Sequence, residues 1–139
     1  MRKILLIVFV LFIGCNNLQN TKLINNLSYP FQNHTTEVVD LHVFREGTEI
    51  VFINESKKHW ISPNIWINQR YVYSVDEVFP GQTVRLKLDL FVDHLGESFS
   101  AGGFFAIKES SSVHLLEIEL PDTGQMVQGI VFENKNQTR

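Results

Sequence analysis

The sequence predicts an all-β fold, an antiparallel β-sandwich of about seven to eight strands. Short runs of alternating apolar and polar residues follow one another from residue 37 onward, as in strands that bury one face. Glycine and proline turns separate these runs at intervals of about 8 to 12 residues. Between residues 37 and 134, no stretch has the periodicity of a convincing amphipathic helix. A small barrel satisfies the same pattern, and we favour the sandwich.

The first two strands are expected at residues 37–44 and 49–54, with the glycine-containing turn REGT between them. In the second strand, Ile50 and Phe52 share one face. Further along, NIWIN and YVYSV flank the short break QR, and this arrangement is typical of a hairpin. Pro80-Gly81 is the strongest turn signal in the chain.

The clearest strand is expected at residues 83–91, TVRLKLDLF, because its alternation is unbroken. The alternation places two sets of side chains on opposite faces, Val84, Leu86, Leu88 and Leu90 inward and Arg85, Lys87 and Asp89 outward. Loops follow at HLGES and AGG. Residues 112–120 and 125–133 form the last two strands, separated by the turn PDTG.

The N-terminus has the layout of a secretory signal peptide. Arg2 and Lys3 give a positive start, ten apolar residues follow from Ile4 to Ile13, and Gly14 is a small residue before a cleavage site. Ten apolar residues are too few for a membrane-spanning helix, which needs about 20. A buried core strand or helix is the alternative, and the abrupt change to NNLQN argues against it.

The stretch Phe12-Ile13-Gly14-Cys15 resembles the lipobox of bacterial lipoproteins, although Phe12 stands where the family usually has leucine. The resemblance implies that Cys15 is acylated and becomes the first mature residue, so the protein would be held at a membrane by its N-terminal lipid. Asn16 resembles the residue found in lipoproteins sent to an outer membrane. The alternative is a free cysteine within an uncleaved signal. Attachment through two or more acyl chains is stable, whereas one chain is marginal.

The sequence therefore predicts four segments: a signal peptide at 1–14, a lipidated N-terminus and tether at 15–36, a sandwich domain at 37–134 and a polar tail at 135–139. The tether is rich in asparagine and poor in charge. It also contains Leu27, Tyr29 and Phe31, so its last part is expected to pack as an edge strand.

Composition excludes several function classes. Removal of Arg2 and Lys3 with the signal peptide changes the formal net charge from −3 to −5, which argues against nucleic acid as a partner. The only cysteine is the predicted lipidation site, so the mature chain has no disulfide, thiolate metal site or cysteine nucleophile. A hydrophobic content of 44% is sufficient for one core.

A second resemblance covers about 80 residues, from INES to the closing strands. The central segment resembles small immunoglobulin-like sandwich domains of bacterial extracytoplasmic proteins, and the resemblance implies that fold without implying catalytic residues. Gln69 stands where the pattern has glycine. The matching positions are Asn54, Trp60, Asn68, Tyr71, Tyr73, Gly81, Phe91, Gly96 and Phe99.

The sequence offers little that carries catalysis or binds a metal. No two of the five histidines have the spacing that places two ligands on one strand face; they are His34, His42, His59, His94 and His114. Glu117 and Glu119 share a strand face and could serve acid–base chemistry or bind calcium, but a row of solvated carboxylates explains them as well. We expect no metal, no cofactor and no enzymatic activity.

The expected function is a binding or interaction module of unknown ligand, anchored by lipid in the bacterial cell envelope, in the periplasm or at the surface. Its candidate binding surface is Lys57, Lys58, His59 and Trp60, a basic and aromatic cluster on an acidic domain. Trp66, within a strand, is expected in the core. The alternatives are an accessory subunit of an envelope complex that pairs a strand edge with its partner, and a hydrolase.

Overall fold

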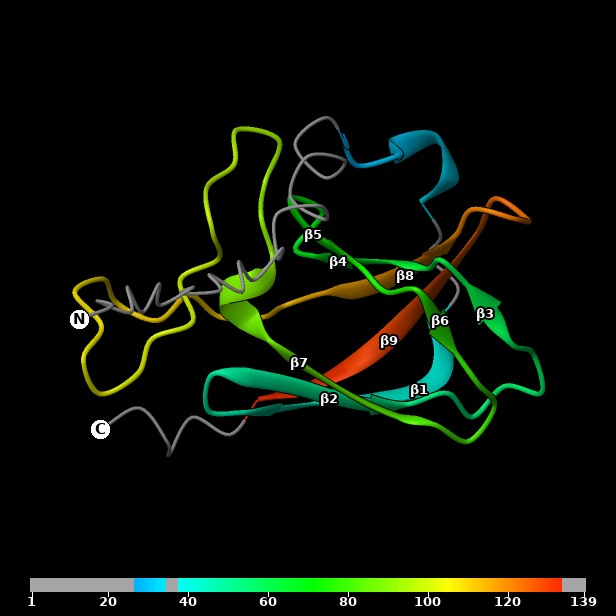
Figure 1. Cartoon of the computed structure of the whole chain (residues 1–139), viewed down its shortest axis with the longest axis horizontal. Helices are drawn as coiled ribbons and strands as arrows, with labels where there is room; N and C mark the ends of the chain where they lie inside the picture. Colours follow the sequence, from blue (N-terminus) through cyan, green and yellow to red (C-terminus); the bar gives the residue numbers. More distant parts are fainter. Residues whose placement is uncertain (1–26, 35–37, 134–139) are drawn as a thin grey trace, which may run out of the picture.

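The computed structural model describes residues 27–34 and 38–133. They form nine strands and two short 3-10 helices, with no α-helix among them, so the all-β prediction is confirmed (Figure 1). The strands are β1 Val38–Glu46, β2 Glu49–Ile53, β3 Trp60–Ile61, β4 Asn64–Ile67, β5 Tyr71–Ser74, β6 Glu77–Val78, β7 Thr83–Lys87, β8 Leu116–Leu120 and β9 Gln125–Glu133; the 3-10 helices are η1 Phe31–Asn33 and η2 Leu88–Leu90.

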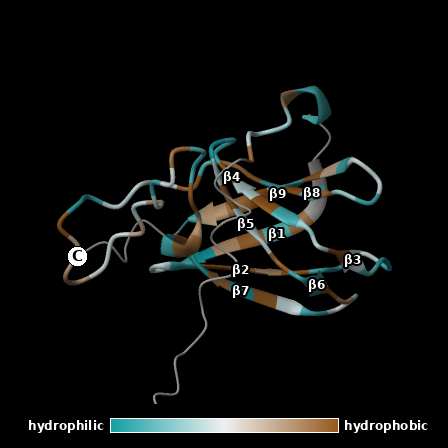
Figure 2. Ribbon diagram, turned by 45° about the horizontal axis from the view of Figure 1, so that its top comes forward, coloured by the Kyte–Doolittle hydropathy of each residue, from teal (hydrophilic) through white to brown (hydrophobic). Residues whose placement is uncertain are grey.

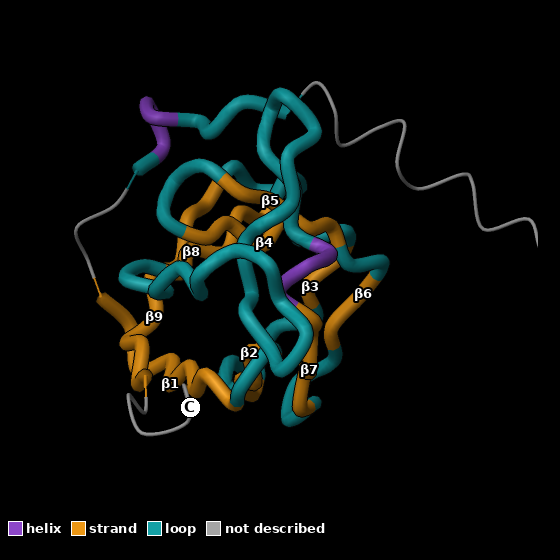
Figure 3. The backbone as a smooth tube through the Cα atoms, turned by 90° about the vertical axis from the view of Figure 1, so that its left-hand side faces the viewer, coloured by secondary structure: helices purple, strands orange, loops and turns teal. Residues whose placement is uncertain are grey.

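Seven strands form one continuous sheet in the order β5-β4-β8-β9-β1-β2-β7, and β3 pairs with β6 in a small second sheet. The large sheet curls, so that β4 and β5 face β2 and β7 across the core (Figure 3). This arrangement differs from the expected antiparallel sandwich in two ways. Seven strands belong to one continuous curled sheet, and that sheet is mixed because β1 runs parallel to β9. The long β1 pairs with β2 on its other side, and it thereby joins the two halves of the sheet.

The parallel pairing of β1 with β9 is irregular between Val38 and His42, and Gly129 of β9 lies opposite this irregularity. A Cβ atom at Gly129 would lie 2.9 Å from Val43 Cγ2 and 3.0 Å from the carbonyl oxygen of Leu41. Only glycine lets β9 approach β1 this closely.

The inner core lies between the two halves of the curled sheet, and the alternation seen in the sequence accounts for most of it. Ile50 and Phe52 of β2 are buried on the same face, as predicted. The larger buried side chains of this cluster are Phe52, Trp60, Ile65, Ile67, Leu88, Phe91, Phe99, Leu116 and Ile118.

The strand predicted at residues 83–91 ends early. Leu88 is fully buried and Leu86 is partly buried, as expected, but Leu90 is 44% exposed rather than inward. The reason is that β7 stops at Lys87 and Leu88–Leu90 forms η2, whose turn rotates Leu90 away from the core. The hairpin β4–β5 and the turn at Pro80-Gly81 are present as predicted.

A second apolar cluster lies on the outer face of β4, β5 and β9, and it consists of Tyr29, Trp66, Val72 and Met126. Residues 27–34, the end of the predicted tether, cover this face instead of pairing as an edge strand. The Tyr29 and Trp66 rings meet edge to face with centroids 5.4 Å apart. Trp66 is therefore buried, as predicted, but on the outer side of the sheet.

Among the described residues, no helix has the length and apolar character needed to cross a bilayer. The predicted signal peptide, Cys15 and the polar tail at 135–139 lie outside the described residues.

Candidate functional site

The predicted binding surface lies at the β3–β6 end of the molecule, and the structure divides its residues. Lys57, Lys58 and His59 are exposed, on the loop that leads into β3. Trp60 is only 4% exposed, because it pairs with Val78 of β6 and packs into the inner core. Trp60 therefore lies beneath this surface, which corrects its predicted place on the surface itself.

An aromatic neighbour that the sequence analysis missed takes the place of Trp60. The His59 ring stacks on the Phe79 ring with centroids 4.3 Å apart and an angle of 10° between the planes. His59 Nε2 also lies 3.2 Å from Glu77 Oε2. Phe79 is 49% exposed, and Ile61, which pairs with Glu77 on the neighbouring strand, is 55% exposed, so the β3–β6 end carries exposed apolar side chains. Phe79 lies beside the predicted turn, and the sequence Phe-Pro-Gly indicates a turn without indicating an exposed aromatic side chain.

A second exposed apolar surface lies at the opposite end of the molecule, on the loop formed by residues 101–110, here called the apolar loop (Figures 1 and 2). Phe104 is 94% exposed, Phe105 is 91% exposed and Ile107 is fully exposed. The two phenylalanine rings contact each other edge to face with centroids 4.9 Å apart. Contiguous exposed apolar side chains of this kind mark interaction sites. The sequence signal was present: Phe-Phe-Ala-Ile follows Gly-Gly and precedes a serine run, without strand alternation.

The base of the apolar loop is held by Arg45 of β1, which is only 8% exposed. Its guanidinium donates hydrogen bonds to the carbonyl oxygens of Ala101 and Ser111, on the two arms of the loop, and to Ser110 Oγ. It also donates to Glu133 of β9, which neutralises its charge. A single buried cation therefore fixes both arms to the sheet.

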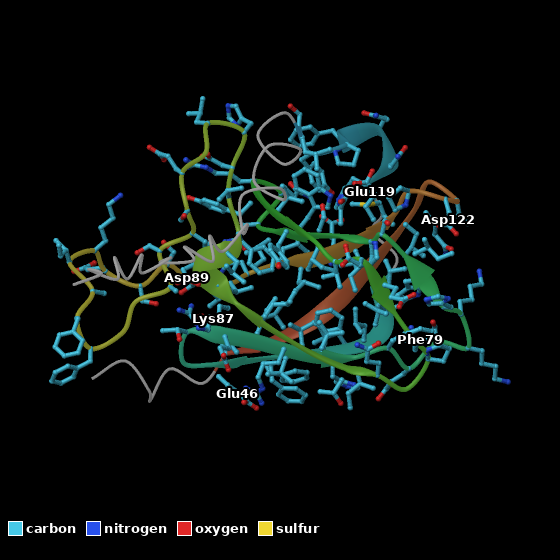
Figure 4. All side chains as sticks on the ribbon, viewed as in Figure 1. Glu46, Phe79, Lys87, Asp89, Glu119 and Asp122 are labelled. Atoms are coloured by element: carbon cyan, nitrogen blue, oxygen red, sulfur yellow. The ribbon has the colours of Figure 1, made fainter. Side chains whose placement is uncertain are left out.

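An open cavity of about 490 Å³ lies between the apolar loop and the η2 end of the sheet. Lys87 and Asp89, at the near edge of this cavity, are labelled in Figure 4. The remaining lining includes Thr48, Ala101, Phe105, Ile107 and Lys108. The cavity lining contains one carboxylate, that of Asp89, and two ammonium groups, those of Lys87 and Lys108.

A buried polar cluster lies beneath residues 27–34. The Tyr29 hydroxyl donates to Glu117 Oε2 at 2.6 Å, and His34 Nδ1 lies 2.7 Å from Glu117 Oε1. Burial, and then the hydrogen bond to Glu117, raises the pKa of the Tyr29 hydroxyl. Glu117 is fully buried, so the expected row of solvated carboxylates is wrong at this position. The strand face is the predicted one, but a distant segment covers it.

Glu119, the next carboxylate on the same face, is also held by neutral donors. Trp66 Nε1 and Asn64 Nδ2 each donate to Glu119 Oε2 at 3.0 Å. Within the described residues, every buried side-chain nitrogen or oxygen has a hydrogen-bond partner. The polar groups of this face are thus used in holding the structure together.

The five histidines occupy separate places in the fold. His34 contacts Glu117, His42 stacks against Phe132, and His59 stacks against Phe79. His94 and His114 are exposed. In residues 27–34 and 38–133, no three His, Cys, Asp or Glu side chains gather in a way that could hold a metal ion.

The outer face of β1 and β9 carries a third apolar patch. Phe44 is 48% exposed and Phe132 is 44% exposed, and their rings stack with centroids 5.3 Å apart. The neighbouring Ile130 is 42% exposed. This patch lies on two strands that pair with each other, β1 and β9.

Comparisons of the chain with protein-family models, with curated proteins and with solved structures found no match.

Proposed function

We propose that this protein is a lipid-anchored binding module of the bacterial cell envelope, with Cys15 as the lipidation site. The signal layout of residues 1–14 and the lipobox-like Phe12-Ile13-Gly14-Cys15 support the anchor. The domain lies outside the cytoplasm and binds an envelope protein or a surface ligand.

The observation that carries the binding proposal is the stacked pair of His59 and Phe79 at the β3–β6 end. Large aromatic side chains held rigidly at a surface lose little conformational entropy on binding, and they are enriched at interfaces. Lys57 and Lys58 extend beside them and add cationic contacts for an anionic group of the partner. The proposed binding surface is therefore Lys57, Lys58, His59, Ile61 and Phe79.

We propose further that the fold is an immunoglobulin-like variant. The strand order supports this, since β2 and β7 form one group and β4, β8 and β9 form another, as strands B, E and C, F, G do in such sandwiches. On this assignment β1 is the first strand, and it bridges the two groups.

The two rival functions receive less support. Strand-edge pairing needs a long open edge, and the edge strands β5 and β7 have only four and five residues. Arg85 on β7 is engaged with Glu46 and Glu49, and such charges discourage edge pairing. A hydrolase needs accessible catalytic groups. In the His34–Glu117 pair the Glu117 carboxylate is buried and accepts a hydrogen bond from Tyr29, although the His34 ring is partly exposed.

The anchor is tested by growing a bacterial host that expresses the full chain with a radiolabelled fatty acid. We expect the wild-type protein to carry the label and Cys15→Ser to lack it, because the thiol is the acceptor. Equal labelling of both proteins would remove the anchor from the proposal.

The binding surface is tested by capture of envelope partners, identified by mass spectrometry. We expect Phe79→Ser to lose most of the captured partner, because it removes the stacked aromatic surface while leaving the backbone bond of Phe79 to Gln82 intact. Leu95→Ser is the matched control, since Leu95 is 71% exposed and lies on another loop. Capture should also weaken at high salt, because exposed charge contacts are screened. If Phe79→Ser captures the same partners as the control, this surface is not the binding site.

A further inference from the structure

We infer that the apolar loop, through Phe104, Phe105 and Ile107, inserts into the lipid bilayer that carries the N-terminal anchor. The inference rests on the proposed anchor but concerns a different surface, at the end of the molecule opposite the His59–Phe79 stack (Figure 1). The three side chains are between 91% and 103% exposed, so almost all of their apolar surface is free for contact.

The base of the loop is built to hold its tip away from the body. Besides the clamp from Arg45, Ser100 Oγ donates to the carbonyl oxygen of Glu109 at 2.6 Å, and the amide of Ser111 donates to that of Ser100 at 2.8 Å. A Cβ atom at Gly102 would lie 2.7 Å from Ser110 Cβ, so the arms meet at a distance that only glycine allows. Gly102 also has φ +80°, in the left-handed region. The loop is therefore fixed before it meets its partner.

The shape and charge of the tip favour a bilayer over a protein. The tip protrudes from the body (Figure 1), and a protein partner would need a pocket matched to three bulky side chains, whereas lipid chains adapt to them. The tip itself, from Phe104 to Ile107, carries no charge, and Lys108 and Glu109, one of each sign, follow it. A lysine beside apolar side chains extends its charge to the headgroups while its stem stays in the apolar layer.

The length of the tether also favours the bilayer. Twelve residue steps separate Cys15 from Leu27, and an extended chain spans at most about 3.6 Å per residue, so the domain stays within about 40 Å of the lipid. Tethering of this kind gives the loop a high effective concentration at the membrane surface. A contact too weak to recruit the protein alone is then sufficient to orient it.

Insertion of the apolar loop would orient the whole domain. Because the β3–β6 surface lies at the other end of the molecule, it would point away from the membrane, toward a partner (Figure 4). The acyl anchor keeps the protein at the bilayer, and the loop determines which end faces it.

The test uses the full lipidated chain, in which the predicted acylation consumes the only cysteine. Ile107→Cys then supplies a single thiol for an environment-sensitive dye, and Asp122→Cys, at the other end, supplies the control (Figure 4). The proteins are reconstituted in vesicles of phosphatidylethanolamine and phosphatidylglycerol. We expect the dye at position 107 to shift to the blue and to lose most of its emission when the acyl chains carry bromine. The dye at position 122 should remain as in water.

Two further chains make the outcome decisive. Phe104→Ser combined with Phe105→Ser, in the Ile107→Cys chain, should lose the shift and the quenching. An unshifted dye at position 107 would overturn the inference, and so would a blue shift without quenching by brominated lipid, which indicates contact with a protein or a second copy. Dye uptake by the wild-type chain reports a free Cys15 and so a failed anchor. A failed anchor removes the attachment on which the inference rests, so that result overturns the inference together with the anchor.

Discussion

Glu117 illustrates how a single residue depends on a segment far away in the chain. Its carboxylate lies on the outward face of β8, where the alternation places it, and yet it is fully buried. The Tyr29 hydroxyl and His34 Nδ1 contact its two oxygens from a segment more than 80 positions earlier. A buried carboxylate is tolerated only when hydrogen bonds replace its water. The burial of Glu117 is therefore stable only while residues 27–34 stay in place.

Tyr29→Phe is expected to destabilise the protein by about 1–3 kcal/mol, because it leaves one oxygen of a buried carboxylate without its donor. Chemical denaturation, followed by circular dichroism, measures the change. Tyr73→Phe is the matched control, since it removes a hydroxyl from the inner side of the neighbouring β5. Equal midpoints for the two variants would mean that the hydroxyl of Tyr29 does not support Glu117.

Asp93 is the residue from which we expect a pH dependence. Burial alone would raise the pKa of this carboxyl, but hydrogen bonds from Arg70 and from the backbone amides of Glu97 and Leu95 hold the pKa below its ordinary value. A lowered pKa in the folded state means that the unfolded chain takes up a proton first as the pH falls. The stability from this group is present above the unfolded pKa and is lost as the pH falls through the folded one.

The prediction for Asp93→Asn is a flatter dependence of the unfolding free energy on pH between about pH 6 and pH 3. The variant is also less stable than the wild type at neutral pH, since the amide no longer neutralises Arg70. Urea titrations at several pH values give both quantities. Asp122→Asn removes a carboxylate from an exposed turn and should keep the wild-type slope. A wild-type slope in Asp93→Asn would contradict the assignment.

At the scale of the element, alternation correctly predicted the strands whose buried face packs against other strands of the sheet. The buried face of β2 and the β4–β5 hairpin followed from local spacing and turn residues. Leu90 was misplaced because alternation does not reveal where a strand gives way to a 3-10 turn. The cover over Trp66 could not be predicted, since it comes from residues 27–34 and not from a strand partner.

The candidate sites were less predictable than the strands. Lys57, Lys58 and His59 are exposed as expected, but the stack of His59 on Phe79 joins two short strands that local patterns did not indicate. Trp60 was misjudged because a two-residue strand gives too little alternation to assign a face. The glycines of the apolar loop predict a loop, but the sequence does not determine whether Phe104 and Phe105 are buried by the sheet or exposed, as they are in the structure.

The change from strand to turn after Lys87 allows a test of the element itself. Leu88→Ala is expected to cost about 2–5 kcal/mol, because the side chain is fully buried in the inner core. Lys87→Ala should change the stability by less than about 0.5 kcal/mol, since its side chain is exposed. Chemical melts of the two variants are compared side by side. Similar midpoints would mean that the assigned faces are wrong.

At the scale of the whole molecule, residues 27–34 belong energetically to the domain although they precede its first strand. They place Tyr29 over Trp66 and close the outer apolar cluster. The inner core forms without residues 27–34, because none of the side chains in that cluster comes from this segment. The fold is therefore expected to form from residue 37 onward, but with one face uncovered.

A chain that begins at residue 37 should retain the β signal in circular dichroism and a cooperative melt. Compared with a chain that begins at residue 27, it should lose about 2.5–6 kcal/mol, because burial of the Tyr29 ring contributes roughly 1.5–3 kcal/mol and its bond to Glu117 a further 1–3 kcal/mol. Its tryptophan emission should shift to the red, since Trp66 becomes exposed to water while Trp60 stays in the inner core. If the two chains melt at the same denaturant concentration with the same emission, residues 27–34 contribute nothing to the domain. A substantially helical spectrum from the shorter chain would instead refute the all-β fold class.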